Sequence, residues 1–318
     1  YFLWAIKEND KYVLITLLQI RKLFIMDNIQ MAEKIKILCK TKKITVKLLL
    51  ENCNINRNFI YDLKNNNKPS IETLEMILKN KSIKFNRLDQ VDDKAEYKYD
   101  STVYDTNIKL GKYTFVSCWT KSEMENIDLW NRYGKGNKGV RISLDEDMFE
   151  TYDVGTVNRS FYNNREYCFE NFVVSSYINK VGLVDVKYEQ NIELYYKEAI
   201  KCFDQGVAFK HDNIGIYKKR EWGLQNESRF IIHAQPFEPA LMSNHPLSFP
   251  LALGTAYRNG MELSRTALYI PLKQEVLEHL EITMGPGTTD EDRKKVEKIL
   301  KDCNIKAEIK DSALKGDL

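Results

Sequence analysis

The chain changes character near Phe85. Before it, residues 26–84 carry twelve Lys or Arg against six Asp or Glu, and their apolar residues recur at three- and four-residue spacings typical of helices. After it, residues 85–318 carry 32 basic against 37 acidic side chains, and segments rich in β-branched and aromatic residues appear. A small basic helical head ahead of a larger, mildly acidic part predicts a polyanion-binding module joined to a different kind of domain.

Composition excludes several classes of protein. Apolar residues make up 43% and charged residues 29% of the chain, and no apolar run approaches the roughly 20 residues of a membrane-spanning helix. We therefore expect a cytoplasmic protein with no membrane partner. The six cysteines are at least fourteen positions apart and none of the four histidines is in HExxH spacing, so reduced thiols and no metal site are expected.

Residues 1–25 are predicted to be an extension outside the folded head. They do not begin with Met, and charges such as Lys7 and Asp10 interrupt any signal-peptide core. Val13 to Ile25 has the pattern of one amphipathic helix, and Met26 is the expected natural start. The predicted domains are this extension, a head at residues 26–80 and a larger domain at residues 81–318.

Within the head, short helices are expected at Ile29–Cys39, from Thr45, at Asn56–Lys64 and at Ile71–Lys79. The stretch "ITVKLLLENCNINRNFIYDLKNNNKPSIETLEMI" (residues 44–77) resembles the Cro/repressor-type helix-turn-helix family. A Leu49-Leu50 pair stands where that family has Leu-Ala, and Cys53 stands at the turn in place of the commoner Gly. The resemblance implies that the helix Asn56–Lys64 enters the major groove of double-stranded DNA.

The outward residues of that helix carry the predicted DNA contacts. Arg pairs bidentately with guanine and Asn with adenine, so Arg57 and Asn58 are candidate base readers. Lysines such as Lys64 and Lys68 are candidate phosphate contacts, which position the protein without reading sequence. The full predicted set is Asn56, Arg57, Asn58, Tyr61, Lys64 and Lys68, with Lys42 and Lys43 as further phosphate contacts. The alternative is a basic four-helix unit that serves only in packing or in forming a homodimer.

The larger domain is expected to be mixed α and β. Strands are predicted at Tyr113–Trp119, Val140–Leu144, Ser228–Ala234, Ala267–Ile270 and Ile305–Ile309. The region at about 160–205 is predicted to be mostly helical. Thr288 and Glu291 have capping-box spacing ahead of a charged helix that ends near Asp302.

Four blocks of the larger part resemble a second family. They are "SIETLEMILKNKSIKFNRLDQVDDKAE", "YTFVSCWTKSEMENIDLWNRYGKGNKGVRISL", "YKKREWGLQNESRFII" and "LEITMGPGTTDEDRKKVEKILKDCNIKAEIKDSALKG". In this order they are similar to the bacterial domain of unknown function 2971 family, from about residue 70 to the C-terminus. The resemblance implies no particular reaction.

Two glycine-rich segments are interpreted structurally. "GKGNKG" at 134–139 matches the letters GxGxxG, but it follows an expected helix and leads into a strand, the reverse of a dinucleotide loop. It is predicted to be a turn with glycines at positive φ. "ITMGPGTTDED" precedes a helix N-terminus, where Asp290 and Glu291 would repel a phosphate.

A comparison with ADP-ribosyltransferase-like folds supplies candidate catalytic residues. Those sites use a His or Arg on a first strand, a hydroxyl after a middle strand and a late Glu, and here Ser117 and Glu227 stand at the last two positions. The family comparison puts Asn67 where the His would stand, so the site is expected to be incomplete. Glu227 would stabilise positive charge on a ribose, with NAD as cofactor; the alternative is an ion pair of Glu227 with Arg229 or Arg220.

Two further groups of residues admit two interpretations each. Asp92, Asp93 and Glu96 form an acidic cluster that would suit a divalent cation or a solvated loop. The second group combines Trp and Arg, which together can stack a nucleobase or cover the core, the second being preferred for Trp119 and Trp130. Its members are Trp119, Trp130, Trp222, Arg132, Arg141 and Arg220.

The sequence thus predicts an α+β protein with an all-α helix-turn-helix head and a larger mixed domain, with an ADP-ribosyltransferase-like fold as an open alternative. The expected function is DNA binding by a regulator whose larger domain is a sensor or effector. The alternative is a nucleotide-using enzyme, a toxin or phage-defence effector. The replacement of the expected His by Asn67 favours the regulator.

Overall fold

The structure is a computed structural model that describes the larger part of the chain and short pieces near its N-terminus. The described residues are 3–8, 11–16, 36–37, 39–41, 70–91, 93, 95–96, 100–103, 106–134, 136–155, 158–163, 166–174, 181–196, 200–203, 206–209 and 213–316. The chain divides into two compact units, Tyr1–Glu72 and Thr73–Leu318. Among the described residues, no helix is both long enough and apolar enough to span a membrane.

The smaller unit begins with a β-hairpin. Strand β1 (Leu3–Glu8) pairs antiparallel with β2 (Lys11–Thr16). The predicted helix from Val13 is therefore wrong over its first four residues. The segment "KYVLIT" is an uninterrupted run of aromatic, β-branched and aliphatic residues between Lys11 and Thr16, and such a run favours a strand.

The described part of the head itself is small. Residues 36, 37 and 39–41 are helical, in agreement with the helix predicted to end near Cys39, and the hydroxyl of Thr41 donates to the carbonyl oxygen of Ile37 at 2.8 Å. The predicted turn and recognition helix lie outside the described residues.

Helix α5 (Ser70–Asn80) confirms the helix predicted at Ile71–Lys79 and crosses the boundary between the two units. Its Leu74 and Leu78 are buried. The division after Glu72 falls earlier than the predicted division after residue 80.

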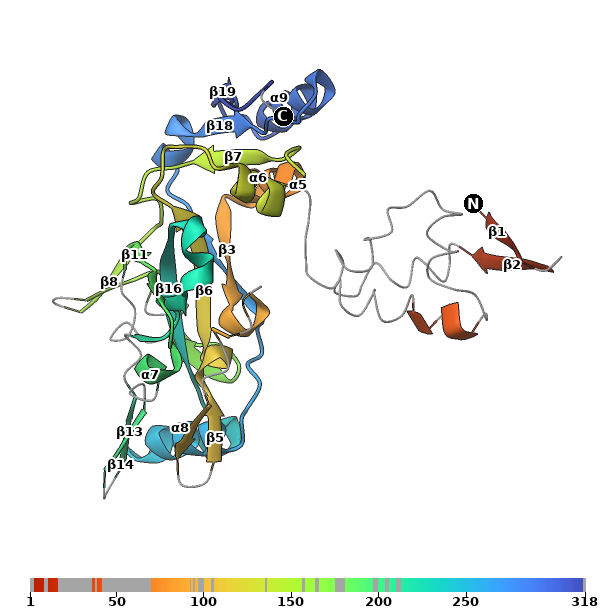
Figure 1. The fold of residues 1–318 in the computed structure, drawn as a ribbon. Helices are drawn as coiled ribbons and strands as arrows, with labels where there is room; N and C mark the ends of the chain where they lie inside the picture. Colours follow the sequence, from red (N-terminus) through yellow and green to blue (C-terminus); the bar gives the residue numbers. More distant parts are fainter. Residues whose placement is uncertain are drawn as a thin grey trace. The chain divides into compact units, whose positions relative to one another are not determined.

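The centre of the larger unit is a curled antiparallel sheet (Figure 1). Its strand order is β10-β16-β6-β3-β17, and β11 pairs with β16 as well. The strands are β3 (Ser82–Arg87), β6 (Thr114–Thr120), β10 (Phe172–Val174), β11 (Val184–Asp185), β16 (Glu227–Pro236) and β17 (Ala267–Pro271). The strands predicted from Tyr113, Ser228 and Ala267 are confirmed as β6, β16 and β17.

Both faces of the central strand β16 are covered. Nine of its ten residues are buried, whereas a strand with one solvated face would alternate. On one face the aromatic ring of Phe230 packs edge-on against Phe149, with ring centroids 4.8 Å apart, and Phe149 also contacts Phe85 and Phe161 at 5.5 Å. The other face carries Glu227 and Arg229, described below.

A second, three-stranded sheet lies at one end of the main sheet (Figure 1). Strand β18 (Glu281–Met284) pairs antiparallel with β7 (Val140–Ser143) and parallel with β19 (Glu308–Asp311). Strand β7 confirms the prediction at Val140–Leu144, and the last strand starts three residues later than predicted. Helix α9 (Asp290–Asp302) has the predicted capping box, but it is formed by Thr289 and Asp292, one residue further along.

The segment predicted to be helical at about 160–205 is mostly not helical where it is described. It contains the short strands β9 (Asn158–Ser160), β10, β11, β12 (Lys187–Glu189) and β13 (Ile200–Phe203), and one short helix, α7 (Glu193–Tyr196). The prediction was wrong because aromatic and β-branched runs such as Phe172–Val174 favour strands whatever the polar residues between them. The other short strands are β4 (Asp100–Val103), β5 (Thr106–Lys109), β8 (Tyr152–Gly155), β14 (Gly206–Phe209) and β15 (Tyr217–Lys219).

Two more helices lie at opposite ends of the main sheet (Figure 1). Helix α8 (Ser248–Arg258) packs its Tyr257 ring edge-on against Tyr113, with centroids 4.9 Å apart. Helix α6 (Ile127–Tyr133) begins at the N-cap Asn126, whose side chain accepts from the backbone N–H of Asp128 at 2.8 Å.

The described residues of the segment 134–139, which follows α6, form the predicted turn. Gly136 and Asn137 both have φ of 69°, and the chain then enters β7. The backbone N–H groups of Gly285 and Gly287 donate to the carbonyl oxygens of Gly139 and Asn137 at 2.8 and 2.9 Å. The two glycine-rich segments therefore pack on one another, which agrees with the structural interpretation of both.

Candidate site: a buried charge cluster beside an open pocket

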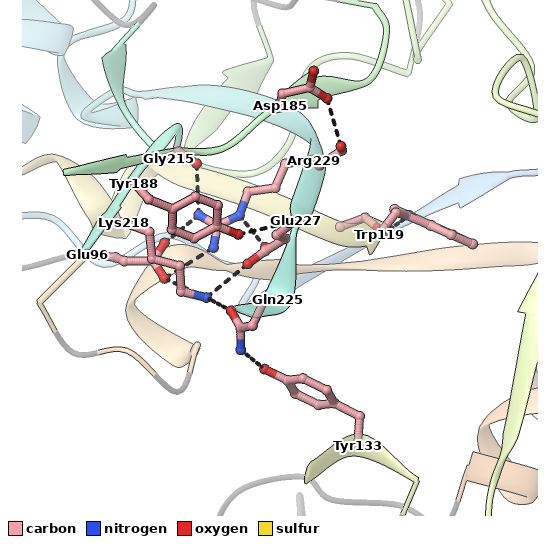
Figure 2. Close-up of polar contacts among 12 residues, drawn as sticks. Glu96, Trp119, Tyr133, Asp185, Tyr188, Gly215, Lys218, Gln225, Glu227 and Arg229 are labelled. Atoms are coloured by element: carbon pink, nitrogen blue, oxygen red, sulfur yellow. Dashed lines mark hydrogen bonds and ion pairs between the residues drawn. The ribbon is translucent and has the colours of Figure 1, made fainter. Parts of the chain in front are cut away.

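Glu227 lies at the start of β16 and is buried in a cluster of charged side chains (Figure 2). The 3₁₀ helix η4 (Arg220–Gln225) ends at Asn226, which has a left-handed φ of 42° and turns the chain into the strand. The Nε of Arg229 donates to Glu227 Oε1 at 2.5 Å, and the Nζ of Lys218 donates to Glu227 Oε2 at 2.9 Å. Each carboxylate oxygen of Glu227 thus has a basic partner.

Glu96 is the second carboxylate of the cluster. It is fully buried, and both terminal nitrogens of the Arg229 guanidinium donate to it, Nη2 at 3.1 Å to Oε1. Lys218 Nζ lies 3.4 Å from the same Oε1. Arg229 Nη1 also donates to the carbonyl oxygen of Gly215 at 2.8 Å, so each of the three guanidinium nitrogens donates at least one hydrogen bond.

The cluster is electrically balanced, with two acids and two bases. Burial alone would raise the pKa of Glu227, but the adjacent Arg229 and Lys218 outweigh it and lower that pKa to about 2. Burial likewise works against the charge on Lys218, but Glu96 and Glu227 raise its pKa. Glu227 therefore stays ionised and paired, which is unlike a carboxylate held ready to exchange a proton near neutral pH.

Neutral polar side chains extend the cluster toward the surface. Lys218 Nζ donates to Gln225 Oε1 at 2.5 Å, and Gln225 Nε2 donates to the hydroxyl of Tyr133 at 2.5 Å (Figure 2). The backbone N–H of Glu227 donates to the hydroxyl of Tyr188 at 2.8 Å. Tyr133 belongs to α6, so this chain of hydrogen bonds ties α6 to the buried charges.

An open pocket of about 450 Å³ lies between α6 and η4, beside the outer end of this hydrogen-bond chain. Gln225 belongs to both the pocket and the cluster, whereas Glu227 does not line the pocket. The lining residues are Asp128, Leu129, Asn131, Arg132, Glu221, Trp222, Leu224 and Gln225. The volume falls within the roughly 300–1,000 Å³ typical of small-molecule sites.

The indole of Trp222 is the only aromatic ring among the lining residues. The guanidinium carbon of Arg132 lies 4.6 Å from the ring centroid, and Lys218 Nζ lies 4.8 Å from it. Both distances are within the range of cation–π attraction. Trp222 and Arg132, singled out from the sequence as residues able to stack a planar group, thus lie together.

Ser117 and Glu227, the two predicted catalytic residues, are not brought together. In the β16–β6 register Ser117 is opposite Phe230 and Glu227 is opposite Thr120, an odd offset that puts them on different faces of the sheet. Ser117 Oγ instead accepts from the indole N–H of Trp119 at 2.9 Å, and Trp119 points away from the cluster (Figure 2). Asn67 lies outside the described residues.

The described acidic residues of the segment 92–96 are buried. Asp92 lies outside the described residues. Asp93 is buried and accepts a hydrogen bond from the backbone N–H of Ala95 at 2.9 Å. Glu96 forms ion pairs with Arg229 and Lys218. A solvated loop is therefore wrong for Asp93 and Glu96. The part of the chain that the structure describes holds no group of three or more His, Cys, Asp or Glu side chains arranged for a metal ion.

The remaining Trp and Arg candidates are distributed between core and surface. Trp130 is buried, as predicted, and its indole N–H donates to Glu125 at 2.8 Å. Trp119 is only half-buried, and Arg220 is exposed. Arg141 reaches the hydroxyl of Thr283 at 3.4 Å across the β7–β18 pair.

Sequence reasoning missed Lys218, Gln225 and the tyrosines that complete the site. The nearest signal was the block "YKKREWGLQNESRFII", in which Lys218, Glu227 and Arg229 occur within twelve residues. The ion pair of Glu227 with Arg229 is one of the two interpretations that the sequence offers for Glu227, but the sequence does not show that the pair is buried. Its burial depends on Glu96, which is more than a hundred positions away in the sequence and joins no local pattern.

The predicted DNA-contacting residues, from Asn56 to Lys68, all lie outside the described residues. In comparisons with known proteins, no family model, no curated protein and no solved structure matches this chain.

Proposed function

We propose that this protein is a DNA-binding regulator, in which the basic head binds duplex DNA and the larger unit senses a small molecule. The observation that carries the proposal is the head's charge, ten basic against six acidic side chains in residues 26–80, in a sequence with helix-turn-helix spacing. Phosphate contacts by lysines supply affinity, and Arg57 and Asn58 on the helix Asn56–Lys64 supply sequence preference.

The arrangement of the larger unit favours sensing over catalysis. Glu227 is held by Arg229 and Lys218 within a buried, balanced cluster, and Ser117 lies on the other face of the sheet. A transferase would need both groups within reach of one ribose. The pocket between α6 and η4, by contrast, is open and has an aromatic ring and polar side chains in its lining.

The test is selection of bound fragments from a pool of genomic or random duplexes, with the full chain. We expect enrichment of one sequence, and we expect Arg57→Ala to lower the affinity for it by about 1–3 kcal/mol and to relax the preference at one base position. Lys298→Ala, which removes an exposed lysine of α9, is the matched control and should bind as the wild type does. Failure to enrich any sequence, or identical binding by Arg57→Ala, contradicts the proposal.

A further inference from the structure

The pocket between α6 and η4 already contains a protein cation on an aromatic face. Arg132 extends from α6 over the Trp222 ring, 4.6 Å from its centroid, and Arg132 is itself exposed. Among the described residues Arg132 forms no ion pair. A cation held on an aromatic ring at an exposed site gains little, so it can be exchanged for another cation.

The acidic side chains around this ring favour positive charge. Asp128 and Glu221 line the pocket, both are exposed, and the described part of the chain supplies no ion-pair partner to either. The nearby ammonium group of Lys218 is neutralised by Glu96 and Glu227 within the buried cluster. With Arg132 turned away, the lining would therefore carry two carboxylates and no free base.

We propose that this pocket binds a small organic cation, a guanidinium or alkylammonium compound, which takes the place of Arg132 on the Trp222 ring. Its positive group would lie over the indole and be neutralised by Asp128 and Glu221, as aromatic faces with acidic neighbours hold quaternary and guanidinium groups. Its apolar part would contact Leu129 and Leu224, the aliphatic lining residues. The hydroxyl of Tyr133 and the amide of Gln225 connect the occupied pocket to the buried cluster.

This inference rests on the proposed sensory role of the larger unit, but it does not depend on DNA binding. Binding of the cation is measured directly on the full chain, so a protein that fails to bind DNA could still bind the cation. The opposite ligand class, an anion such as a nucleotide, would use Arg132 as its partner. The two classes therefore differ in the effect of removing Arg132.

The experiment is calorimetric titration of the full chain with agmatine and tetramethylammonium as cationic probes and AMP as an anionic probe. Agmatine binding should tighten roughly two- to fivefold in Arg132→Ala, because the competing internal cation is gone. It should weaken by up to about fivefold in Asp128→Asn and in Glu221→Gln, and further in the double variant. Glu297→Gln, an exposed carboxylate of α9, is the matched control and should leave the affinity unchanged.

Each other outcome overturns the proposal. If neither cationic probe binds, or if the wild type and the double acidic variant bind agmatine equally, the pocket is not a cation site. Binding of AMP that is lost in Arg132→Ala assigns the pocket to anions instead. Circular dichroism of each variant establishes that the fold is retained, and the altered lining residues Asp128, Arg132 and Glu221 are all exposed, so their replacement leaves the core intact.

Discussion

At the scale of single residues, the strongest constraint in the larger unit is the need to neutralise charge in its interior. Arg229 is fully buried and bonded to Glu96, to Glu227 and to a backbone carbonyl. A buried ion pair gains little over a well-packed apolar pair, but removing one partner leaves an uncompensated charge. The cluster therefore contributes less to stability than its number of contacts suggests. Removing any one of its charged side chains is nevertheless expected to destabilise the fold strongly.

Arg229→Met tests this asymmetry. It leaves Glu96 with the ammonium group of Lys218 as its one remaining basic partner in the cluster, at 3.4 Å, and should lower the free energy of unfolding by about 3–5 kcal/mol. Lys310→Met is the control, because Lys310 pairs with Glu281 and Glu308 in solvent and its loss should cost about 0–1 kcal/mol. Urea denaturation followed by circular dichroism measures both. Equal effects of the two substitutions would contradict the account of the cluster.

The depressed pKa of Glu227 predicts a specific dependence of stability on pH. Its pKa is about 2 in the folded chain and near 4.5 when unfolded, so its stabilising contribution is complete above about pH 4.5 and is lost as the pH falls toward 2. Glu227→Gln cannot titrate there. Between pH 5 and pH 2, the wild type should lose roughly 3 kcal/mol more free energy of unfolding than the variant does. Parallel profiles in urea titrations at several pH values would show that Glu227 is not held in its ionised form.

At the scale of elements, the sequence predicts correctly the helices and strands that have a strong local signal. The β-branched run of β16 and the capped charged helix α9 lie close to where the sequence places them. The region at about 160–205 was mispredicted, because its strands are two to four residues long and too short to show a period. The charge cluster was not predictable, since the contact between Glu96 and Arg229 is made by the fold and not by neighbours in sequence.

The packing of the two glycine-rich segments yields a matched pair of variants. A Cβ on Gly285 would lie 2.4 Å from the carbonyl oxygen of Asn137 and 2.8 Å from that of Gly139, and neither backbone atom can move aside cheaply. Gly285→Ala should therefore lower the free energy of unfolding by about 1–3 kcal/mol.

The control for Gly285→Ala is the same change at Gly254. Gly254 lies inside α8 with nothing within 4 Å of its missing Cβ, so Gly254→Ala should raise the free energy of unfolding by about 0.5–1 kcal/mol through helix propensity. Thermal unfolding followed by circular dichroism compares the two. A stabilising effect at Gly285 would contradict the close packing of residues 137–139 against the loop that follows β18.

At the scale of the whole molecule, charge is divided between head and larger unit. The head, residues 26–80, has ten basic against six acidic side chains, while residues 81–318 have 34 against 37. The buried side chains of Glu96, Lys218, Glu227 and Arg229 neutralise one another. An acidic larger unit adds no attraction for a polyanion. We therefore expect the proposed DNA binding to arise from the head, and this determines how it responds to salt.

The logarithm of the DNA association constant should fall linearly with the logarithm of the salt concentration, because each neutralised phosphate releases counterions. Lys64→Ala and Lys68→Ala should each reduce the magnitude of that slope by about 0.9 and weaken all sequences alike, since phosphate contacts carry no sequence information. Lys298→Ala and Lys310→Ala, on the larger unit, should leave the slope unchanged. Fluorescence anisotropy with a labelled duplex at roughly 50–300 mM salt measures all four. A slope that is insensitive to Lys64 and Lys68 but flattened by Lys298→Ala would transfer DNA binding from the head to the surface of the larger unit.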